Sequence, residues 1–243
     1  IIKICDRKFI GCDQLIIIKK NEISDASLEF YNSDGSTSGA CGNGTRCVAN
    51  LLAKESNKNS IVLTTLSGNL KSEILGDRIV STEIGIGKTE WNEIPLSKNL
   101  NTNNLNIKIT DKNNNEHTGG TAINVGNPHI IFFVDNNNNF NIQKIGPEIE
   151  NHEFFPEKCN VTLATIVNKK LIKVKVWERG AGLTKACGTA ACATAFAAKQ
   201  NQLVDNKVDI EFSTGKLSIS IDQNNSIHMK GPVSDIKNIE IKI

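Results

Sequence analysis

Two short stretches of the chain decide the fold: residues 41–45 read CGNGT and residues 187–191 read CGTAA. In each, a cysteine and a glycine come directly before a segment rich in alanine and other apolar residues, which is the pattern of a helix start. The two cysteines, Cys41 and Cys187, are 187 − 41 = 146 positions apart. The same spacing recurs along the chain, so the two stretches belong to a larger repeat.

Matching residues continue on both sides of the two cysteines. Four further pairs keep an offset of 146 or 147, namely Gln14 with Asn160, Asn32 with Glu178, Gly68 with Gly215 and Gly85 with Gly231. A near-constant offset over most of the chain indicates two copies of one structural unit. The sequence therefore predicts two similar α+β domains, related by a pseudo-two-fold axis, with the ligand site in the cleft between them.

Each copy is predicted to contain two strands, one helix and a strand–turn–strand. Helices are expected to begin near Gly42 and Gly188. Short or alternating apolar runs predict strands at residues 15–19, 27–31, 61–65, 70–74, 161–166, 172–177, 208–212 and 217–221. The polar residues 111–120 suggest the connection, so we expect domains at residues 1–115 and 116–234, with residues 235–243 returning as a strand to the first.

Composition narrows the class of protein. The 243 residues carry a formal net charge of +2, which argues against a nucleic-acid partner. The apolar runs are too short to cross a membrane, and no signal-peptide pattern opens the chain. Seven cysteines without that pattern form a poor disulfide framework, so we expect a cytoplasmic protein. No CxxC pair and no nucleotide-binding glycine motif appears, so we expect neither a metal nor a cofactor.

A cysteine directly before a helix can do acid–base chemistry. The first backbone N–H groups of a helix and its dipole favour negative charge, so the pKa of such a thiol is expected to fall below about 8.5. The plain alternative is a small apolar residue at a tight turn, which is also our interpretation of Cys47 and Cys192. Two such thiols on either side of one carbon could remove a proton from one face and return a proton to the other.

Four motifs resemble the diaminopimelate epimerase family. They are residues 32–36 (NSDGS), 40–47 (ACGNGTRC), 126–129 (GNPH) and 177–189 (WERGAGLTKACGT), and the likeness covers the whole chain. One departure lies before Gln14, where residues 9–12 have one glycine fewer than the family pattern. The resemblance implies two domains, each a mostly antiparallel sheet or barrel around a central helix.

The resemblance also implies an activity and a set of roles. The activity is cofactor-independent epimerisation of LL-diaminopimelate to meso-diaminopimelate in lysine and peptidoglycan biosynthesis. Cys41 and Cys187 would be the acid–base pair, and His129 and Glu178 would tune the pKa values of the thiols. Substrate would be bound by Gln14, Asn32, Gly42, Asn43, Asn127, Asn160, Glu178, Arg179, Gly188 and Thr189.

Alternatives remain at the level of the sequence. One is a proline racemase or hydroxyproline epimerase, and another is a catalytically inactive binding protein of the same fold. The oligomeric state is open, with a homodimer as one option. The repeat partner of Asn127 would fall at 127 − 146 = −19, and family members usually begin with a further strand. We therefore expect about two to three dozen residues upstream of Ile1, enough for a strand and its connection.

Overall fold

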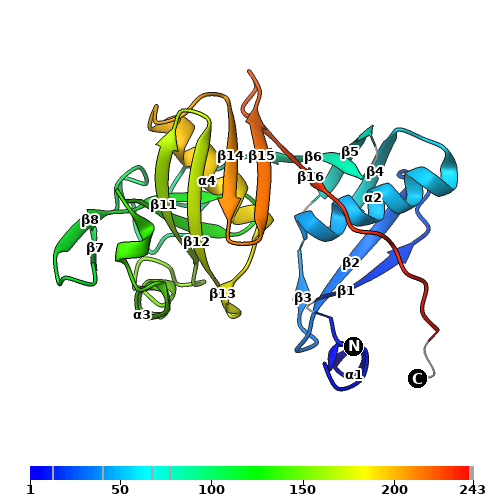
Figure 1. The fold of residues 1–243 in the computed structure, drawn as a ribbon, viewed down its shortest axis with the longest axis horizontal. Helices are drawn as coiled ribbons and strands as arrows, with labels where there is room; N and C mark the ends of the chain where they lie inside the picture. Colours follow the sequence, from blue (N-terminus) through cyan, green and yellow to red (C-terminus); the bar gives the residue numbers. More distant parts are fainter. Residues whose placement is uncertain (13, 40, 67, 77, 241–243) are drawn as a thin grey trace. The chain divides into compact units, whose positions relative to one another are not determined.

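The structure is a computed structural model that describes residues 1–12, 14–39, 41–66, 68–76 and 78–240. Position 40 of the second motif and residues 241–243 of the expected C-terminal strand lie outside the described residues. The chain divides into two compact units, the first comprising residues 1–83 and 230–243 and the second residues 84–229. Figure 1 shows the path of the chain through both.

The first unit is a small sheet with one long helix packed on it. Its strands follow the order β1-β2-β4-β5-β6, and β3 pairs with β2. The helix α2 contacts β4 and β5 (Figure 1). The elements are α1 (Ile2–Cys5), β1 (Gln14–Lys19), β2 (Ala26–Asn32), β3 (Thr37–Ser38), α2 (Gly42–Ser56), β4 (Ser60–Thr65), β5 (Gly68–Gly76) and β6 (Ile79–Ile86), the last of which continues into the second unit.

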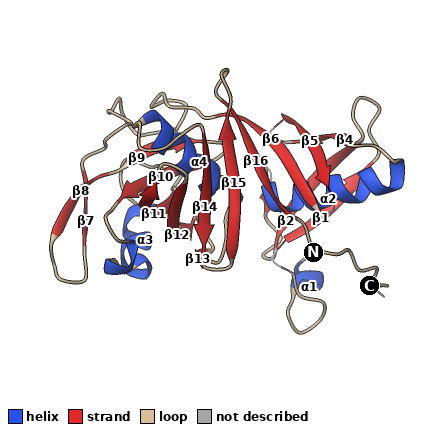
Figure 2. Ribbon diagram, turned by 45° about the horizontal axis from the view of Figure 1, so that its top comes forward, coloured by secondary structure: helices blue, strands red, loops and turns tan. Residues whose placement is uncertain are grey.

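The second unit has a larger sheet with the strand order β15-β14-β12-β11-β10-β9, β13 on β12 and a separate β7-β8 hairpin. Its elements are β7 (Ile107–Thr110), β8 (Glu116–Gly119), β9 (Thr121–Asn124), β10 (Pro128–Phe133), η1 (Asn137–Asn139), α3 (Ile142–Glu150), β11 (Asn160–Asn168), β12 (Leu171–Glu178), β13 (Gly182–Thr184), α4 (Gly188–Gln200), β14 (Lys207–Phe212), β15 (Gly215–Ile221) and β16 (Ser226–Pro232), which leads back to the first unit (Figure 2).

Two apolar clusters form the core of the second unit. The alanine-rich α4 is buried along almost its whole length against one of them, which includes Val174 and Val176 of β12. The amphipathic α3 packs against the other, which includes Val161 and Leu163 of β11. Burial of these apolar side chains is the main favourable contribution to folding.

The repeat predicted from sequence is present in the strand register of each unit. Leu15 pairs with Tyr31 between β1 and β2, and Val161 pairs with Trp177 between β11 and β12, both shifted by 146. The same holds for Phe30 with Ser38 and Val176 with Thr184. After the helices the offset is 147, since Thr65 pairs with Gly68 and Phe212 with Gly215. Both units are therefore copies of one α+β arrangement.

The division between the units differs from the expected boundary at residues 115/116. Residues 84–115 belong to the second unit because they supply part of its core: Ile94, Leu96, Leu105, Ile107 and Ile109 are buried there. Lys88 is also paired with Asn124 through two backbone hydrogen bonds of 2.8 and 3.0 Å. The polar loop at residues 111–115 is the turn of the β7-β8 hairpin and not a domain linker.

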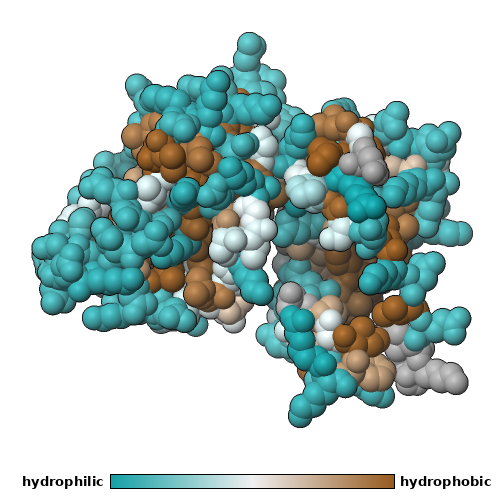
Figure 3. All heavy atoms as spheres, viewed as in Figure 1, coloured by the Kyte–Doolittle hydropathy of each residue, from teal (hydrophilic) through white to brown (hydrophobic). Residues whose placement is uncertain are grey.

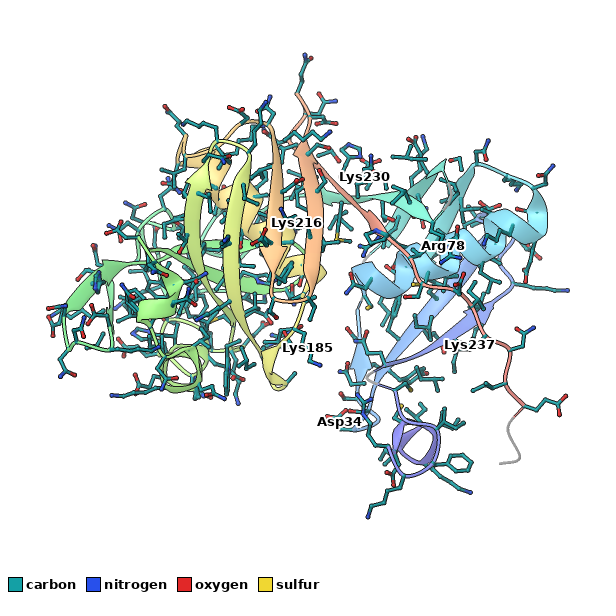
Figure 4. The ribbon with its side chains drawn as sticks, viewed as in Figure 1. Asp34, Arg78, Lys185, Lys216, Lys230 and Lys237 are labelled. Carbon is teal, nitrogen blue, oxygen red and sulfur yellow. The ribbon has the colours of Figure 1, made fainter. Side chains whose placement is uncertain are left out.

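The C-terminal segment lies with the first unit, and its residues 235–240 do not form the strand that the sequence predicted. Val233 donates its backbone N–H to the Arg78 carbonyl at 2.9 Å and is buried in the apolar core of the first unit, with Leu28 and Phe30. The guanidinium of Arg78, which is labelled in Figure 4, lies 2.8 Å from the Asp235 carboxylate. These contacts, and not a ladder of strand hydrogen bonds, hold the segment.

The helix α3 was not among the predicted elements. It has Gly146 and Pro147 in its middle, and both residues lower helix propensity. Tertiary packing compensates, because Ile142, Ile145 and Ile149 fall on one buried face.

Hydrophilic side chains cover the end of the second unit around the β7-β8 hairpin (Figure 3). Among the described residues, no helix has the length and apolar character needed to cross a membrane.

Candidate active site

Each unit presents one cysteine as the N-cap of its principal helix. Cys41 caps α2 with backbone angles φ −138° and ψ 105°, and Cys187 caps α4 with φ −138° and ψ 117°. The Cys41 Sγ accepts a hydrogen bond from the Gly44 backbone N–H at 3.4 Å. The Cys187 Sγ lies 3.4 Å from the Thr189 hydroxyl. Both sulfurs therefore sit where helix N–H groups and the helix dipole favour a negative charge.

The Cys187 thiol differs from the sequence expectation of a lowered pKa. Cys187 is buried, and burial raises the pKa of its thiol above the ordinary range. The negative charge of Glu178 raises this pKa further, whereas hydrogen bonding to Thr189 and to the Ala190 backbone acts in the opposite direction. The penalty for burying a thiolate thus outweighs the helix N-terminus, and Cys187 is protonated in this structure at neutral pH.

The contribution of Glu178 can be tested by chemistry at the sulfur. We expect Glu178→Gln to lower the pKa of Cys187, because the neutral amide removes the charge that opposes the thiolate. A higher thiolate fraction makes alkylation faster, by about three- to tenfold at about pH 8. The rate is measured with iodoacetamide by mass spectrometry of the Cys187 peptide. The exposed Glu153→Gln is the control, and an unchanged or slower rate in Glu178→Gln would contradict the assignment.

In the first unit, the structure brings Gln14 and Asn32 together. The two residues pair in register between β1 and β2, and the Gln14 side-chain amide donates to the Asn32 Oδ1 at 3.0 Å. Asn32 also donates to the Ser36 hydroxyl at 3.0 Å across the turn that carries Asp34, labelled in Figure 4. A polar pair at this strand end is suited to hydrogen bonding with an amino acid.

The N-terminal part of α2 contains Arg46, to which the sequence analysis assigned no role. Arg46 is 4 % exposed, and its guanidinium donates to the Asn43 Oδ1 at 2.8 Å and to the Gly42 carbonyl at 3.4 Å. These contacts orient the two residues expected to bind the reacting end of a substrate. An arginine inside the glycine-rich motif, three residues after Asn43, is the sequence signal for this contact.

In the second unit, Asn160 connects two of the predicted site segments. Its Nδ2 donates to the Pro128 carbonyl at 3.0 Å, and its Oδ1 accepts from the Arg179 backbone N–H at 3.0 Å. Asn160 also pairs in register with His129 on the neighbouring strand β10. The Arg179 guanidinium donates to the Glu157 carbonyl at 2.8 Å. Asn160, which is 3 % exposed, thus fixes where the β12–β13 turn begins.

His129 is fully buried and uncharged at neutral pH. Burial, with a smaller contribution from the nearby Arg179 charge, lowers its pKa to about 3. Its Nε2 lies 2.8 Å from the Asn127 Oδ1, which makes Nε2 the protonated nitrogen because an amide oxygen can only accept. Among the described residues, its Nδ1 has no hydrogen-bond partner. Any effect of His129 on a thiol would therefore come from this lone pair and not from positive charge.

The remaining predicted residues take their places on the same elements. Asn127 lies in the β9–β10 turn, where Gly126 has φ +106° and needs the freedom of glycine. Gly188 and Thr189 form the first turn of α4. Lys185, between β13 and Cys187, is labelled in Figure 4. The predicted residues thus form two sets, one in the first unit and a larger one in the second.

A family model described as diaminopimelate epimerase matches residues 1–90 and 121–236. This match includes both capping cysteines and every predicted site residue. The chain belongs to the diaminopimelate epimerase family. It is 71 % identical over 243 residues to a diaminopimelate epimerase of Pelagibacter ubique, covering all of this chain and 89 % of that protein. It is 40 % identical over 229 residues to the one from Caulobacter vibrioides, covering 93 % of this chain and 80 % of that protein.

Solved structures show the same fold at low sequence identity. A phenazine biosynthesis protein of the PhzF family from Bacillus anthracis matches with a TM-score of 0.65, 14 % identity and coverage of 96 % of this chain and 86 % of that one. A hydroxyproline epimerase from Agrobacterium vitis matches with a TM-score of 0.62, 12 % identity and coverage of 95 % and 75 %. The predicted α+β fold class, family and enzyme class, an isomerase, are confirmed, and neither sequence alternative is favoured.

Proposed function

We propose that this member of the family epimerises LL-diaminopimelate to meso-diaminopimelate, with Cys41 and Cys187 as the two acid–base groups and without a cofactor. The observation that carries the proposal is the matched pair of helix caps, each a cysteine with φ −138° at the same position of the repeat. One such cysteine alone is compatible with a packing role. Two at equivalent positions support a reaction that uses a thiol from each copy.

In the proposed reaction, one proton is removed from the α-carbon of the substrate and a different proton is added to it. One cysteine, as the thiolate, takes the proton from the α-carbon, and the electrons of the C–H bond spread into the adjacent carboxylate. The other cysteine, as the thiol, donates its proton to the opposite face of the same carbon. The centre is inverted, and the two sulfurs have exchanged protonation states. Nothing is oxidised or reduced, and the reverse reaction uses the sulfurs in opposite roles.

The protonated Cys187 suits the donor role in one direction. Burial and Glu178 keep its proton in place, so it is ready to deliver that proton to a carbanion-like centre. The helix N-terminus beside it favours the negative charge that grows on the substrate carboxylate in the transition state. The proposed carboxylate ligands are the backbone N–H groups after each cysteine, at Gly42, Asn43, Gly188 and Thr189.

The distal end of diaminopimelate carries a second ammonium and a second carboxylate. Glu178 suits the ammonium, and Arg179 suits the carboxylate because guanidinium groups bind carboxylates in a bidentate manner. Gln14, Asn32, Asn127 and Asn160 provide further hydrogen bonds, and His129 supplies an uncharged acceptor. We place the enzyme in the cytoplasm, in the supply of meso-diaminopimelate for lysine and peptidoglycan synthesis, with a small molecule as its partner.

Solvent exchange tests both the substrate and the two-base mechanism. In heavy water, the meso product formed early from LL-diaminopimelate is expected to carry deuterium at the inverted carbon, because the donor thiol exchanges with solvent. The remaining LL-diaminopimelate is expected to keep its hydrogen, because the abstracting and donating groups differ. L-proline and trans-4-hydroxy-L-proline serve as controls and should show no exchange. Absence of product deuterium, or exchange of proline instead, would refute the proposal.

A further inference from the structure

A buried carboxylate on α3 contacts the turn that carries Glu178 and Arg179. Glu150, the last residue of α3, is 7 % exposed. Its Oε2 accepts a hydrogen bond from the Trp177 indole N–H at 2.7 Å, and its Oε1 accepts from the Gly180 backbone N–H at 3.0 Å. The two donors are the residues on either side of Glu178 and Arg179, so Glu150 holds both ends of that dipeptide.

The same helix also fits closely against the Trp177 ring. Gly146 lies one helical turn before Glu150, and a Cβ added there would overlap the Trp177 indole ring. Only glycine lets the backbone of α3 come so near to the indole. Two residues of α3 therefore fix the Trp177 side chain. Its ring packs against Gly146, and its indole N–H is hydrogen-bonded to Glu150.

An internal hydrogen bond, from the Ala181 backbone N–H to the Glu178 carbonyl at 3.0 Å, also holds the turn. Gly180 and Gly182 have φ +74° and +82°, which leaves the turn with two residues of high conformational freedom. The Arg179 backbone N–H is held by Asn160 at 3.0 Å, and the Gly180 backbone N–H by Glu150. Consecutive backbone N–H groups are thus each bound to a side chain from outside the turn.

The chemistry of this contact requires a carboxylate. Two N–H donors converge on residue 150, so both of its terminal atoms must be acceptors. A glutamine has one oxygen and one NH₂ group, and whichever donor faced the NH₂ group would lose its partner in a buried place. A carboxylate accepts both bonds, and its charge strengthens each of them.

We propose that Glu150 is a positioning residue of the active site: it fixes the Glu178–Arg179 segment in the orientation that recognises the distal head of the substrate. The proposal rests on the proposed function for its substrate. Glu150 acts on proton transfer only through Glu178, because the cysteine caps themselves are placed by α2 and α4 and not by α3. Loss of Glu150 should therefore weaken substrate recognition more than it slows the chemical step.

Two variants of Glu150 test the proposal. We expect Glu150→Gln to lower kcat/KM for LL-diaminopimelate by about tenfold, mainly through a higher KM. Glu150→Ala loses both acceptors and should lower kcat/KM by about 10²-fold. Binding of diaminopimelate, followed by calorimetry, should weaken in the same order. The matched control is Glu148→Gln on the same helix, which is exposed and should stay within about twofold of the unaltered chain.

A second control separates positioning from loss of stability. Ile149→Val shortens a buried side chain of α3 and should lower the melting temperature while leaving KM unchanged. All kinetic constants are measured below the lowest melting temperature of the set. If Ile149→Val raises KM as much as Glu150→Gln does at a similar loss of stability, Glu150 has only a structural role and the proposal is overturned.

The outcomes distinguish this inference from the proposed function. An unaltered chain that epimerises diaminopimelate, together with a Glu150→Gln variant of equal KM and affinity, overturns the positioning role and leaves the function intact. An unaltered chain that binds diaminopimelate without turning it over overturns the two-cysteine proposal, and the calorimetric series then decides on Glu150. A chain that neither binds nor turns over this substrate overturns both.

Discussion

Cys187→Ala is expected to abolish epimerisation of diaminopimelate, with a loss of at least about 10³-fold in kcat, because the alanine side chain can neither donate nor accept a proton. Cys41→Ala should have the same effect, since each direction of the reaction needs both sulfurs. The two losses should not add in the double variant, because removing either group already stops the reaction. The rate is measured in both directions from the appearance of the other stereoisomer.

The fold should survive these substitutions, and a neighbouring cysteine provides the control. Cys192 is fully buried on α4, the same helix that Cys187 caps. Cys192→Ala also removes one buried thiol, so it should cost about 1 kcal/mol of stability and leave kcat within about twofold. Epimerisation at the normal rate in either Cys41→Ala or Cys187→Ala would exclude the two-thiol mechanism. A similar loss in Cys192→Ala would show that the assay reports packing and not acid–base chemistry.

The repeat could be predicted from sequence because it rests on local rules. A cysteine and a glycine before a helix, and alternating apolar residues in strands, are patterns of neighbouring residues, and the offset between Cys41 and Cys187 links them. The register of both units follows the same offset, as shown by Leu15 with Tyr31 and Val161 with Trp177.

The elements that were missed depend on tertiary packing. The helix α3 contains Gly146 and Pro147, and it is stabilised by a core that the local sequence does not show. The second unit begins at residue 84 and not at the predicted residue 116 for a similar reason. Apolar residues such as Ile94 and Ile107 belong to it because they are buried in that core. A signal for Glu150 was present, since it is an acidic residue on the apolar face of a helix, but reading it required the helix to be recognised first.

The raised pKa of Cys187 has a similar origin. A helix N-terminus can be read from sequence, and it predicts a lowered thiol pKa. Burial and the position of Glu178 cannot be read in this way, because they depend on how β12 and β13 bring Glu178 to the start of α4. The direction of the pKa shift is therefore a property of the folded unit and not of the motif.

Asn160→Asp is expected to destabilise the protein by about 2–3 kcal/mol near neutral pH, although the two side chains have the same shape. The Asn160 Oδ1 can keep its bond from the Arg179 backbone N–H. At the other position, the amide that donates to the Pro128 carbonyl would become a carboxylate oxygen, and two acceptors would face each other about 3.0 Å apart. The site is 3 % exposed, so water cannot separate them.

This penalty should depend on pH with a definite sign. Burial and the facing carbonyl raise the pKa of the new carboxyl in the folded state above its unfolded value of about 3.9. The protonated form can donate its O–H to Pro128, so the variant should approach the stability of the unaltered chain below about pH 4. The penalty should grow as the pH rises through the folded pKa. Asn160 itself does not titrate, so the difference between the two proteins isolates this group.

Urea denaturation of both proteins at several pH values between about 4 and 8 measures the difference. Asn168→Asp is the matched control, because Asn168 ends the same strand β11 but is exposed, and its Oδ1 only accepts from the Lys170 backbone N–H at 2.8 Å. That variant should change the free energy of unfolding by less than about 0.5 kcal/mol at any of these pH values. If Asn160→Asp is as stable as the unaltered chain at pH 8, the Asn160–Pro128 hydrogen bond does not hold β10 to β11.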